Sequence, residues 1–254
     1  MMKRKYIIGL LWAVLSWSAV QAASPDSLIR TAERAYNKGL YDSAVNVYNQ
    51  ILKQGLDSAD LYYNLGNAWF KKGELPHAIL YYEKAKKLAP NDEDILYNLK
   101  VANSMIVDKI EPVPKFFFQK WWDYFYNLFG ADIWAVVLLV VWALLVLFIG
   151  IFFLSSDRRY KKLGFYLGLM FLLLTGASYA LAVQKYHHSV NHDEAIVFTP
   201  TLTVKSSPTQ TAVDLFVIHE GTKVKILDKV NHWVKIKISN GSIGWVPEKS
   251  IEEI

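Results

Sequence analysis

The chain has 254 residues, of which 53% are hydrophobic, with a formal net charge of +5 and no cysteine. The charge does not predict nucleic-acid binding, because Lys3, Arg4 and Lys5 and the basic stretch 155–162 account for it and leave the remainder near −1. The lack of cysteine excludes disulfides, thiolate nucleophiles and cysteine metal sites. The length allows two small domains besides any membrane segment.

Residues 1–22 have the pattern of a secretory signal peptide. Three cations precede an apolar run over 6–15, and the small residues Val20 and Ala22 occupy the −3 and −1 positions of a cleavage site. An uncleaved anchor helix is the alternative. Both interpretations predict that the chain from Ala23 onward lies outside the cytoplasm.

Residues 25–108 contain an internal repeat with a period of 34. At that shift Gly39 aligns with Gly73, Ala44 with Ala78 and Tyr48 with Tyr82. The second copy, 59–92, resembles the tetratricopeptide repeat (TPR), a helix-turn-helix unit in which small residues let two helices approach closely. Here those residues are Gly66 and Ala78. The first copy, 25–58, is weaker, and 93–108 predicts a capping helix over the last apolar face.

The resemblance to TPR domains implies a concave groove lined by the first helix of each repeat. Asn64 and Asn98 occupy positions where such domains hold a peptide backbone, because an amide both donates and accepts hydrogen bonds. The alternative is that these amides bond only to neighbouring helices or water. The predicted groove residues are Arg30, Glu33, Tyr63, Asn64, Asn67, Phe70, Lys71, Tyr97 and Asn98.

Residues 116–130 carry nine aromatic side chains in 15 positions. Phe118, Trp121, Trp122 and Phe125 recur at helical spacing, and polar residues occupy the opposite face. This pattern predicts an amphipathic helix in the lipid headgroup layer. An aromatic protein-binding patch is the competing interpretation.

Two uncharged runs, 133–154 and 163–183, predict a pair of transmembrane helices, since each is long enough to cross a bilayer core. The intervening loop, 155–162, carries four cations and is expected in the cytoplasm. Both outer segments then lie on the far side. The small residues Gly164 and Gly168 predict close packing against the first helix or, alternatively, a homodimer contact. No Asp, Glu, Lys, Arg or His lies inside either run, so an ion or proton path is not expected.

Residues 194–254 change to short alternating segments, and the six predicted strands are 195–198, 202–205, 214–218, 223–229, 233–238 and 242–246, with a tight turn at Asn240–Gly241. These strands predict a small β-barrel that closes its own edges. The segments Val204–Pro208, Glu220–Val224, Trp233–Ile236 and Gly244–Val246 resemble the bacterial SH3 domain. Such domains bind peptides or cell-wall material in some proteins and pack against partners in others. Trp233 and Trp245 are the candidate ligand surface, with barrel core or rim positions as the alternative.

The sequence offers no constellation for catalysis. No phosphate-binding loop, nucleophile elbow or dinucleotide fingerprint occurs, and no nucleophile has a base and an orienting partner. His187, His188 and His192 lack the additional ligands of a closed metal site. We therefore expect neither enzymatic activity, nor a metal, nor a cofactor.

The predicted fold class is a multidomain membrane protein: an all-α TPR solenoid, a transmembrane helical hairpin and a small all-β SH3-like barrel. This arrangement resembles the BatE-like proteins of the aerotolerance (Bat) operon family, which occur beside von Willebrand factor A membrane proteins and a MoxR-type ATPase. The resemblance implies a two-pass protein of the bacterial inner membrane with both folded ends in the periplasm. It implies a scaffold that contacts membrane lipid and other Bat proteins. The alternative is a sensor whose SH3-like domain binds peptidoglycan.

Overall fold

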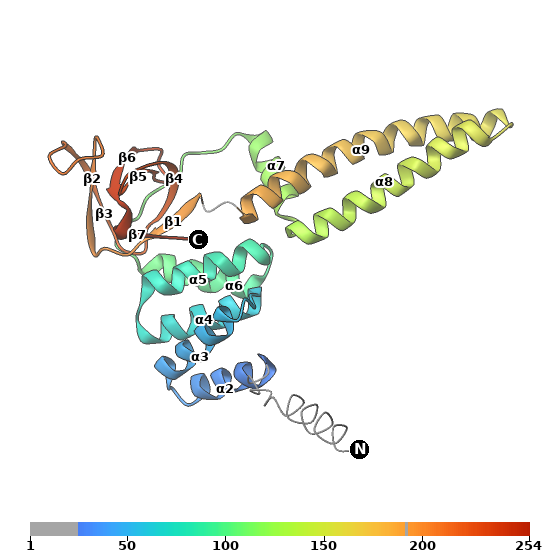
Figure 1. Cartoon of the computed structure of the whole chain (residues 1–254). Helices are drawn as coiled ribbons and strands as arrows, with labels where there is room; N and C mark the ends of the chain where they lie inside the picture. Colours follow the sequence, from blue (N-terminus) through green and yellow to red (C-terminus); the bar gives the residue numbers. More distant parts are fainter. Residues whose placement is uncertain (1–24, 191–192) are drawn as a thin grey trace, which may run out of the picture. The chain divides into compact units, whose positions relative to one another are not determined.

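The computed structural model describes residues 25–190 and 193–254 (Figure 1). The predicted signal peptide therefore lies outside the described residues. The chain divides into two compact units at Gly55, and the described part of the first unit is 25–55. Each unit is considered by itself below.

The first unit is the helical pair α2 (Pro25–Asn37) and α3 (Tyr41–Lys53). Gly39, with φ +75°, turns the chain between the helices, a conformation that glycine adopts without steric cost. Ala32, Ala44 and Tyr48 are buried, as the repeat pattern requires. This pair is the first repeat.

The second repeat begins the second unit with α4 (Ala59–Lys72) and α5 (Leu75–Leu88). The Ser58 hydroxyl caps α4 by accepting from the backbone N–H of Leu61 at 3.1 Å. A Cβ added at Gly66 would lie 2.7 Å from two ring carbons of Tyr82. The predicted close approach of the two helices at Gly66 is thus confirmed.

Helix α6 (Glu93–Met105) is the predicted capping helix and ends three residues before the predicted boundary. Its first turn is capped by Asp92, whose carboxylate accepts from the N–H of Ile95 at 3.0 Å. Its buried side chains Ile95, Leu99 and Ala102 lie at helical spacing.

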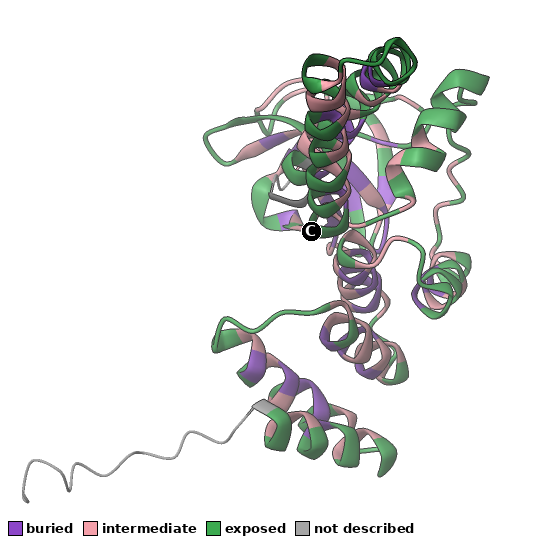
Figure 2. Ribbon diagram, turned by 90° about the vertical axis from the view of Figure 1, so that its right-hand side faces the viewer, coloured by how far each residue is buried: buried purple, intermediate pink, exposed green. Residues whose placement is uncertain are grey.

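Three helices follow: α7 (Phe117–Asn127), α8 (Ala131–Leu154) and α9 (Arg158–Val190). Helices α8 and α9 pair along their length and are long and apolar enough to span a membrane (Figure 1). The non-helical turn is shorter than the predicted loop, because α9 already begins at Arg158. Most side chains of α8 are exposed, and Phe153 and Leu154 are 74% and 87% exposed. Figure 2 shows this exposure along the hairpin.

Gly164 and Gly168 of α9 differ in their surroundings. A Cβ at Gly164 would meet backbone atoms of Phe152 and Phe148 at 2.8 and 2.9 Å, so α8 and α9 touch closely there. A Cβ at Gly168 would meet nothing within 4 Å. Packing within the hairpin therefore explains Gly164 but not Gly168.

The C-terminal region is one antiparallel sheet in the order β3-β2-β6-β5-β4-β1-β7. No pairing joins β3 to β7 among the described residues, so the curved sheet is open at those two strands rather than closed as predicted. Strand β7 and the 3₁₀ turn before it were not predicted. The strands are β1 (Glu194–Val197), β2 (Thr201–Lys205), β3 (Asp214–His219), β4 (Lys223–Val230), β5 (Trp233–Lys237), β6 (Ile243–Pro247) and β7 (Ile251–Glu253).

Candidate functional site

The second TPR repeat and the β-sheet domain share one apolar core. Strand β1 has two buried faces: Ala195 and Val197 belong to the core of the sheet domain, whereas Ile196 belongs to the core of α5 and α6. Ile254 and Phe198 join Ile196 there. We name this contact the TPR–SH3 junction. Its apolar members from the helices are Ala78, Ile79, Leu80, Tyr82, Leu99 and Ala102.

A buried ion pair crosses the TPR–SH3 junction. Lys223 Nζ of β4 lies 3.0 Å from Glu83 Oε2 of α5 and 2.8 Å from Glu194 Oε2 of β1. The Glu83 side chain is only 8% exposed. Burial raises the pKa of Glu83, but the cations of Lys223 and Lys86 outweigh this effect and hold the pKa below its ordinary value. Glu83 is therefore a buried, charged and paired group.

Asp108, just beyond α6, forms a second polar link across the same junction. Its Oδ2 accepts from the backbone N–H of His219 at 2.6 Å and from the Thr222 hydroxyl at 2.7 Å. Its Oδ1 lies 2.8 Å from His219 Nδ1. Burial raises the pKa of Asp108. The hydrogen bonds from Thr222 and His219 together lower it by more, so the pKa lies below its ordinary value. Asp108 thus closes the turn between β3 and β4.

The predicted groove asparagines differ in what their amides bond. Asn98 Nδ2 donates to the Tyr63 hydroxyl at 3.0 Å and to Asn67 Oδ1 at 2.9 Å, which uses both of its hydrogens. The Tyr82 hydroxyl also donates to Asn67 Oδ1, at 2.7 Å. Asn98 keeps only its carbonyl oxygen for a ligand. Asn64 is half-buried and its side chain makes no hydrogen bond among the described residues, so its whole side-chain amide is available.

The other predicted groove residues are distributed as follows. Phe70 packs against the shared core, whereas Lys71 and Tyr97 are exposed on α4 and α6. Arg30 and Glu33 are exposed on α2, in the first unit. The structure therefore brings Tyr63, Asn67 and Asn98 into contact and leaves peptide binding in the groove a prediction.

Trp233 and Trp245 lie on the face of the sheet that points away from the core. Lys235 is opposite Trp245 and Trp233 is opposite Pro247, whereas the intervening Val234 is buried. Lys235 Nζ lies 5.8 Å from the centre of the Trp245 ring, a cation–π distance. Both indoles are half-buried. They form a rim surface rather than part of the core.

The aromatic surface of α7 is highly exposed, with Phe117 at 73% and Trp121 at 69%. Trp122 instead donates from Nε1 to Gln184 Oε1 of α9 at 2.9 Å. Next to it, Lys185 Nζ lies 4.2 Å from the centre of the Tyr126 ring. Helix α7 is thereby fixed to the end of the hairpin, with an apolar side left uncovered.

The predicted histidine cluster lies mostly outside the described side chains. His187 is exposed, the side chain of His188 is not described, and His192 lies outside the described residues. Among the residues that are described, no group of three metal-ligating side chains comes together.

The TPR–SH3 junction was not predicted from the sequence, although two patterns indicated it. Residues 195–198 are continuously apolar, without the alternation of a strand that has one solvated face. Residues 78–82 on α5 are also continuously apolar, instead of being spaced along one face of the helix. Both patterns are typical of elements covered on two sides.

Comparison with known protein families supports both folded regions. Residues 29–93 match the model of the tetratricopeptide repeat family, and residues 200–252 match the model of the bacterial SH3 domain. The chain therefore contains a TPR region and a bacterial SH3 domain. No curated protein matches the chain.

Proposed function

We propose that this protein is a membrane-anchored, non-enzymatic scaffold for protein–protein interaction, in which the second TPR repeat and the SH3 domain act as one body. The observation that carries this proposal is the TPR–SH3 junction, because it joins two interaction modules through a shared core and the Glu83–Lys223 pair. A rigid pair of modules holds two partners at a fixed distance, which is the task of a scaffold.

The proposal places both modules outside the cytoplasm, with α8 and α9 spanning the bacterial inner membrane. Its support is the exposed apolar surface of the hairpin and the cations at its turn. The TPR–SH3 junction adds a physical constraint, since two regions that share a core must lie on the same side of a membrane. Protease digestion of a C-terminal tag in intact spheroplasts tests this topology. Digestion only after lysis would overturn it.

The same architecture leads us to propose membership of a Bat-type complex, with von Willebrand factor A membrane proteins as partners and a role in aerotolerance or envelope maintenance. Photo-crosslinkers at Asn64 and Tyr97, which are accessible on α4 and α6, would identify the neighbours in cells. We expect crosslinks to other membrane proteins of the operon. Crosslinks to lipid alone would remove the basis for partner binding in the groove.

A second function is favoured by the outward position of Trp233 and Trp245, which suits stacking on a cell-wall glycan or peptide. Pull-down of the full-length protein with isolated peptidoglycan tests this sensor. Loss of binding in the variant Trp233→Ala/Trp245→Ala would support it. Retention of the scaffold partners without any wall binding would support the scaffold alone.

A further inference from the structure

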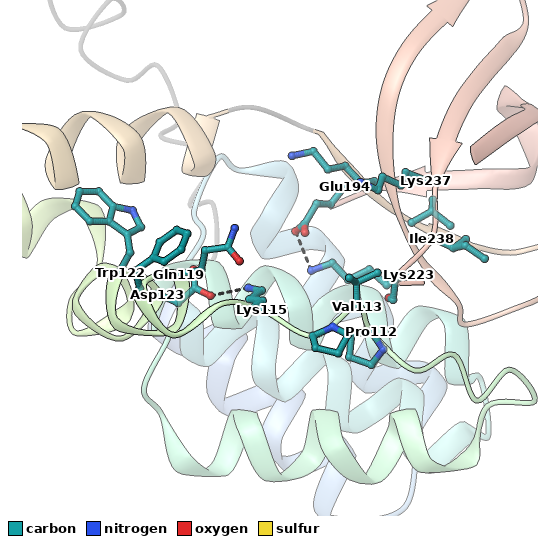
Figure 3. A pocket seen from close by; sticks show the side chains of 15 residues that line it. Pro112, Val113, Lys115, Gln119, Trp122, Asp123, Glu194, Lys223, Lys237 and Ile238 are labelled. Carbon is teal, nitrogen blue, oxygen red and sulfur yellow. Dashed lines mark hydrogen bonds and ion pairs between the residues drawn. The ribbon is translucent and has the colours of Figure 1, made fainter. Parts of the chain in front are cut away.

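A cleft of about 930 Å³ lies between the start of α7 and the SH3 domain (Figure 3). One wall consists of the linker Pro112–Pro114 and the side chains of Phe118 and Trp122. The opposite wall comes from β4, β5 and the residues after them, including Lys237 and Ile238. The linker is fixed to this wall, because the N–H of Val113 donates to the Ser239 carbonyl at 3.2 Å.

The cleft lies next to the end of a predicted membrane span. Trp122, which lines the cleft, donates to Gln184, and Gln184 directly follows the uncharged run 163–183. The end of such a run coincides with the headgroup layer, where tryptophan is enriched. A lipid headgroup beside the hairpin would therefore be within reach of the cleft.

The charges on the strand wall are not balanced. Lys225 and Lys237 are direct cross-strand partners on β4 and β5, and both line the cleft. Like charges in this position repel each other. Lys225 has one acidic neighbour, Asp193, at 3.3 Å, whereas Lys237 is exposed and has no ion pair among the described residues.

The remaining cations of the cleft are already paired. Lys115 lies 2.6 Å from Asp123, and Lys223 lies 2.8 Å from Glu194. Dashed lines in Figure 3 mark both pairs. These two carboxylates are therefore compensated within the cleft. Since Asp193 pairs with Lys225, one positive charge, that of Lys237 beside Lys225, has no compensating carboxylate among the described residues.

We propose that this cleft binds the headgroup of an anionic phospholipid, with its phosphate held between Lys225 and Lys237. Lysine ammonium groups bind phosphate as point charges. The glycerol and the first acyl carbons would then lie over Phe118 and Trp122, which are 57% and 42% exposed. The lipid would couple the SH3 domain to the membrane surface. This proposal depends on the proposed membrane insertion of α8 and α9.

The test uses the full-length protein in a neutral detergent and two short-chain lipids, dihexanoyl phosphatidylglycerol and dihexanoyl phosphatidylcholine. Binding is measured by native mass spectrometry and by the lipid-dependent rise in the unfolding temperature. We expect the anionic lipid to bind about tenfold more tightly. The variant Lys225→Gln/Lys237→Gln should lose this preference.

The matched control is Lys100→Gln/Lys249→Gln, which removes the same charge from exposed positions on α6 and in the turn before β7. It should bind the anionic lipid as the wild type does. If the cleft variant has a lower unfolding temperature without lipid, the single variant Lys237→Gln replaces it, since Lys237 has no ion pair to lose in the described structure.

Three results would overturn the proposal: equal affinity for both lipids, equal loss in the cleft and control variants, or equal stabilisation by glycerol 3-phosphate. The last result would assign the cleft to a soluble phosphate compound. None of these measurements depends on membrane topology or on a protein partner. Failure here would leave the scaffold proposal standing, and failure of the topology experiment would not alter the measured lipid preference.

Discussion

The two TPR repeats have the same 34-residue spacing but different surroundings. In the first repeat, α2 and α3 bury a small core of their own within a separate compact unit. In the second, α5 also contributes to the core that it shares with β1. One copy is thus an ordinary helical pair, whereas the other is half of a composite domain.

The two repeats differ in how far two equivalent positions on the second helix are buried. Leu80 and Glu83 of α5 are buried, whereas the residues 34 positions earlier on α3 are Asn46, which is exposed, and Asn49, which is half-buried. Asn46 and Asn49 line a shallow hollow with other α3 residues. A repeat can therefore remain a separate unit or join another fold through substitutions at a few surface positions.

Replacing Glu83 should give the largest difference in stability between the two repeats. We expect Glu83→Ala to lower the free energy of unfolding by about 3 kcal/mol, because it removes a charged hydrogen bond to Lys223 and the buried packing of the Glu83 side chain, even though Lys223 keeps Glu194. Thermal unfolding of the full-length protein in detergent measures this effect. The equivalent Asn49→Ala in the first repeat should cost less than about 0.5 kcal/mol. Equal costs at both positions would contradict the distinction.

Gly66 gives the next largest expected effect. We expect Gly66→Ala to destabilise the protein by about 2 kcal/mol, because the new methyl group would overlap the Tyr82 ring. The first repeat already has alanine, the buried Ala32, at the equivalent position. There, Ala32→Gly should cost about 1.5 kcal/mol, because it lowers helix propensity and removes a buried methyl group. A neutral or stabilising Gly66→Ala would show that α4 and α5 are less closely packed.

Replacing Asn98 should have a smaller effect on stability than replacing Glu83 or Gly66. Asn98→Ala removes the donor to Tyr63 and Asn67, and we expect a loss of about 1 kcal/mol. Asn64→Ala should leave the unfolding temperature unchanged and reduce only crosslinking to a groove partner. An equal loss of stability in both variants would argue against separate structural and binding roles.

The prediction with the smallest expected effect at neutral pH concerns the stability of the protein in acid. Glu83 and Asp108 both have lowered pKa values in the folded protein, so the unfolded chain binds protons first as the pH falls. Their contribution is complete above the ordinary carboxyl values of 4.5 and 3.8 and is lost as the pH falls through the lower folded values. Unfolding temperatures from pH 7 to pH 3 measure this loss. Glu83→Gln should make the decline shallower, and an unchanged slope would contradict the assignment.

Most elements were predicted from local patterns. The period of 34 gave both helical pairs, because Gly39, Gly73 and the small core residues act within one repeat. The six predicted strands agree with β1 to β6 within a few residues, since alternation and the Asn240–Gly241 turn are local features. Strand β7 was missed because Ile251–Glu253 is too short to show a period, and only its pairing with β1 makes it a strand.

The candidate sites were less predictable. The sequence placed Asn98 and Asn64 in equivalent roles, but only the packing of α6 on α4 decides that Asn98 bonds to Tyr63 and Asn67. The outward position of Trp233 and Trp245 follows from sheet register, which alternation indicates but does not fix. Glu83 and Lys223 are 140 residues apart, and no short-range pattern relates them.

By itself, the sequence determined the kinds of modules present: two helical repeats with a cap, two long apolar helices and a small β domain. It did so because period, length and turn residues are properties of neighbouring positions. Only the tertiary structure decided that the second repeat and the SH3 domain share a core, with Asp108 and Glu83 bonded across it. The physical reason is that burial and charge pairing depend on which surfaces meet, and those surfaces come from distant parts of the chain.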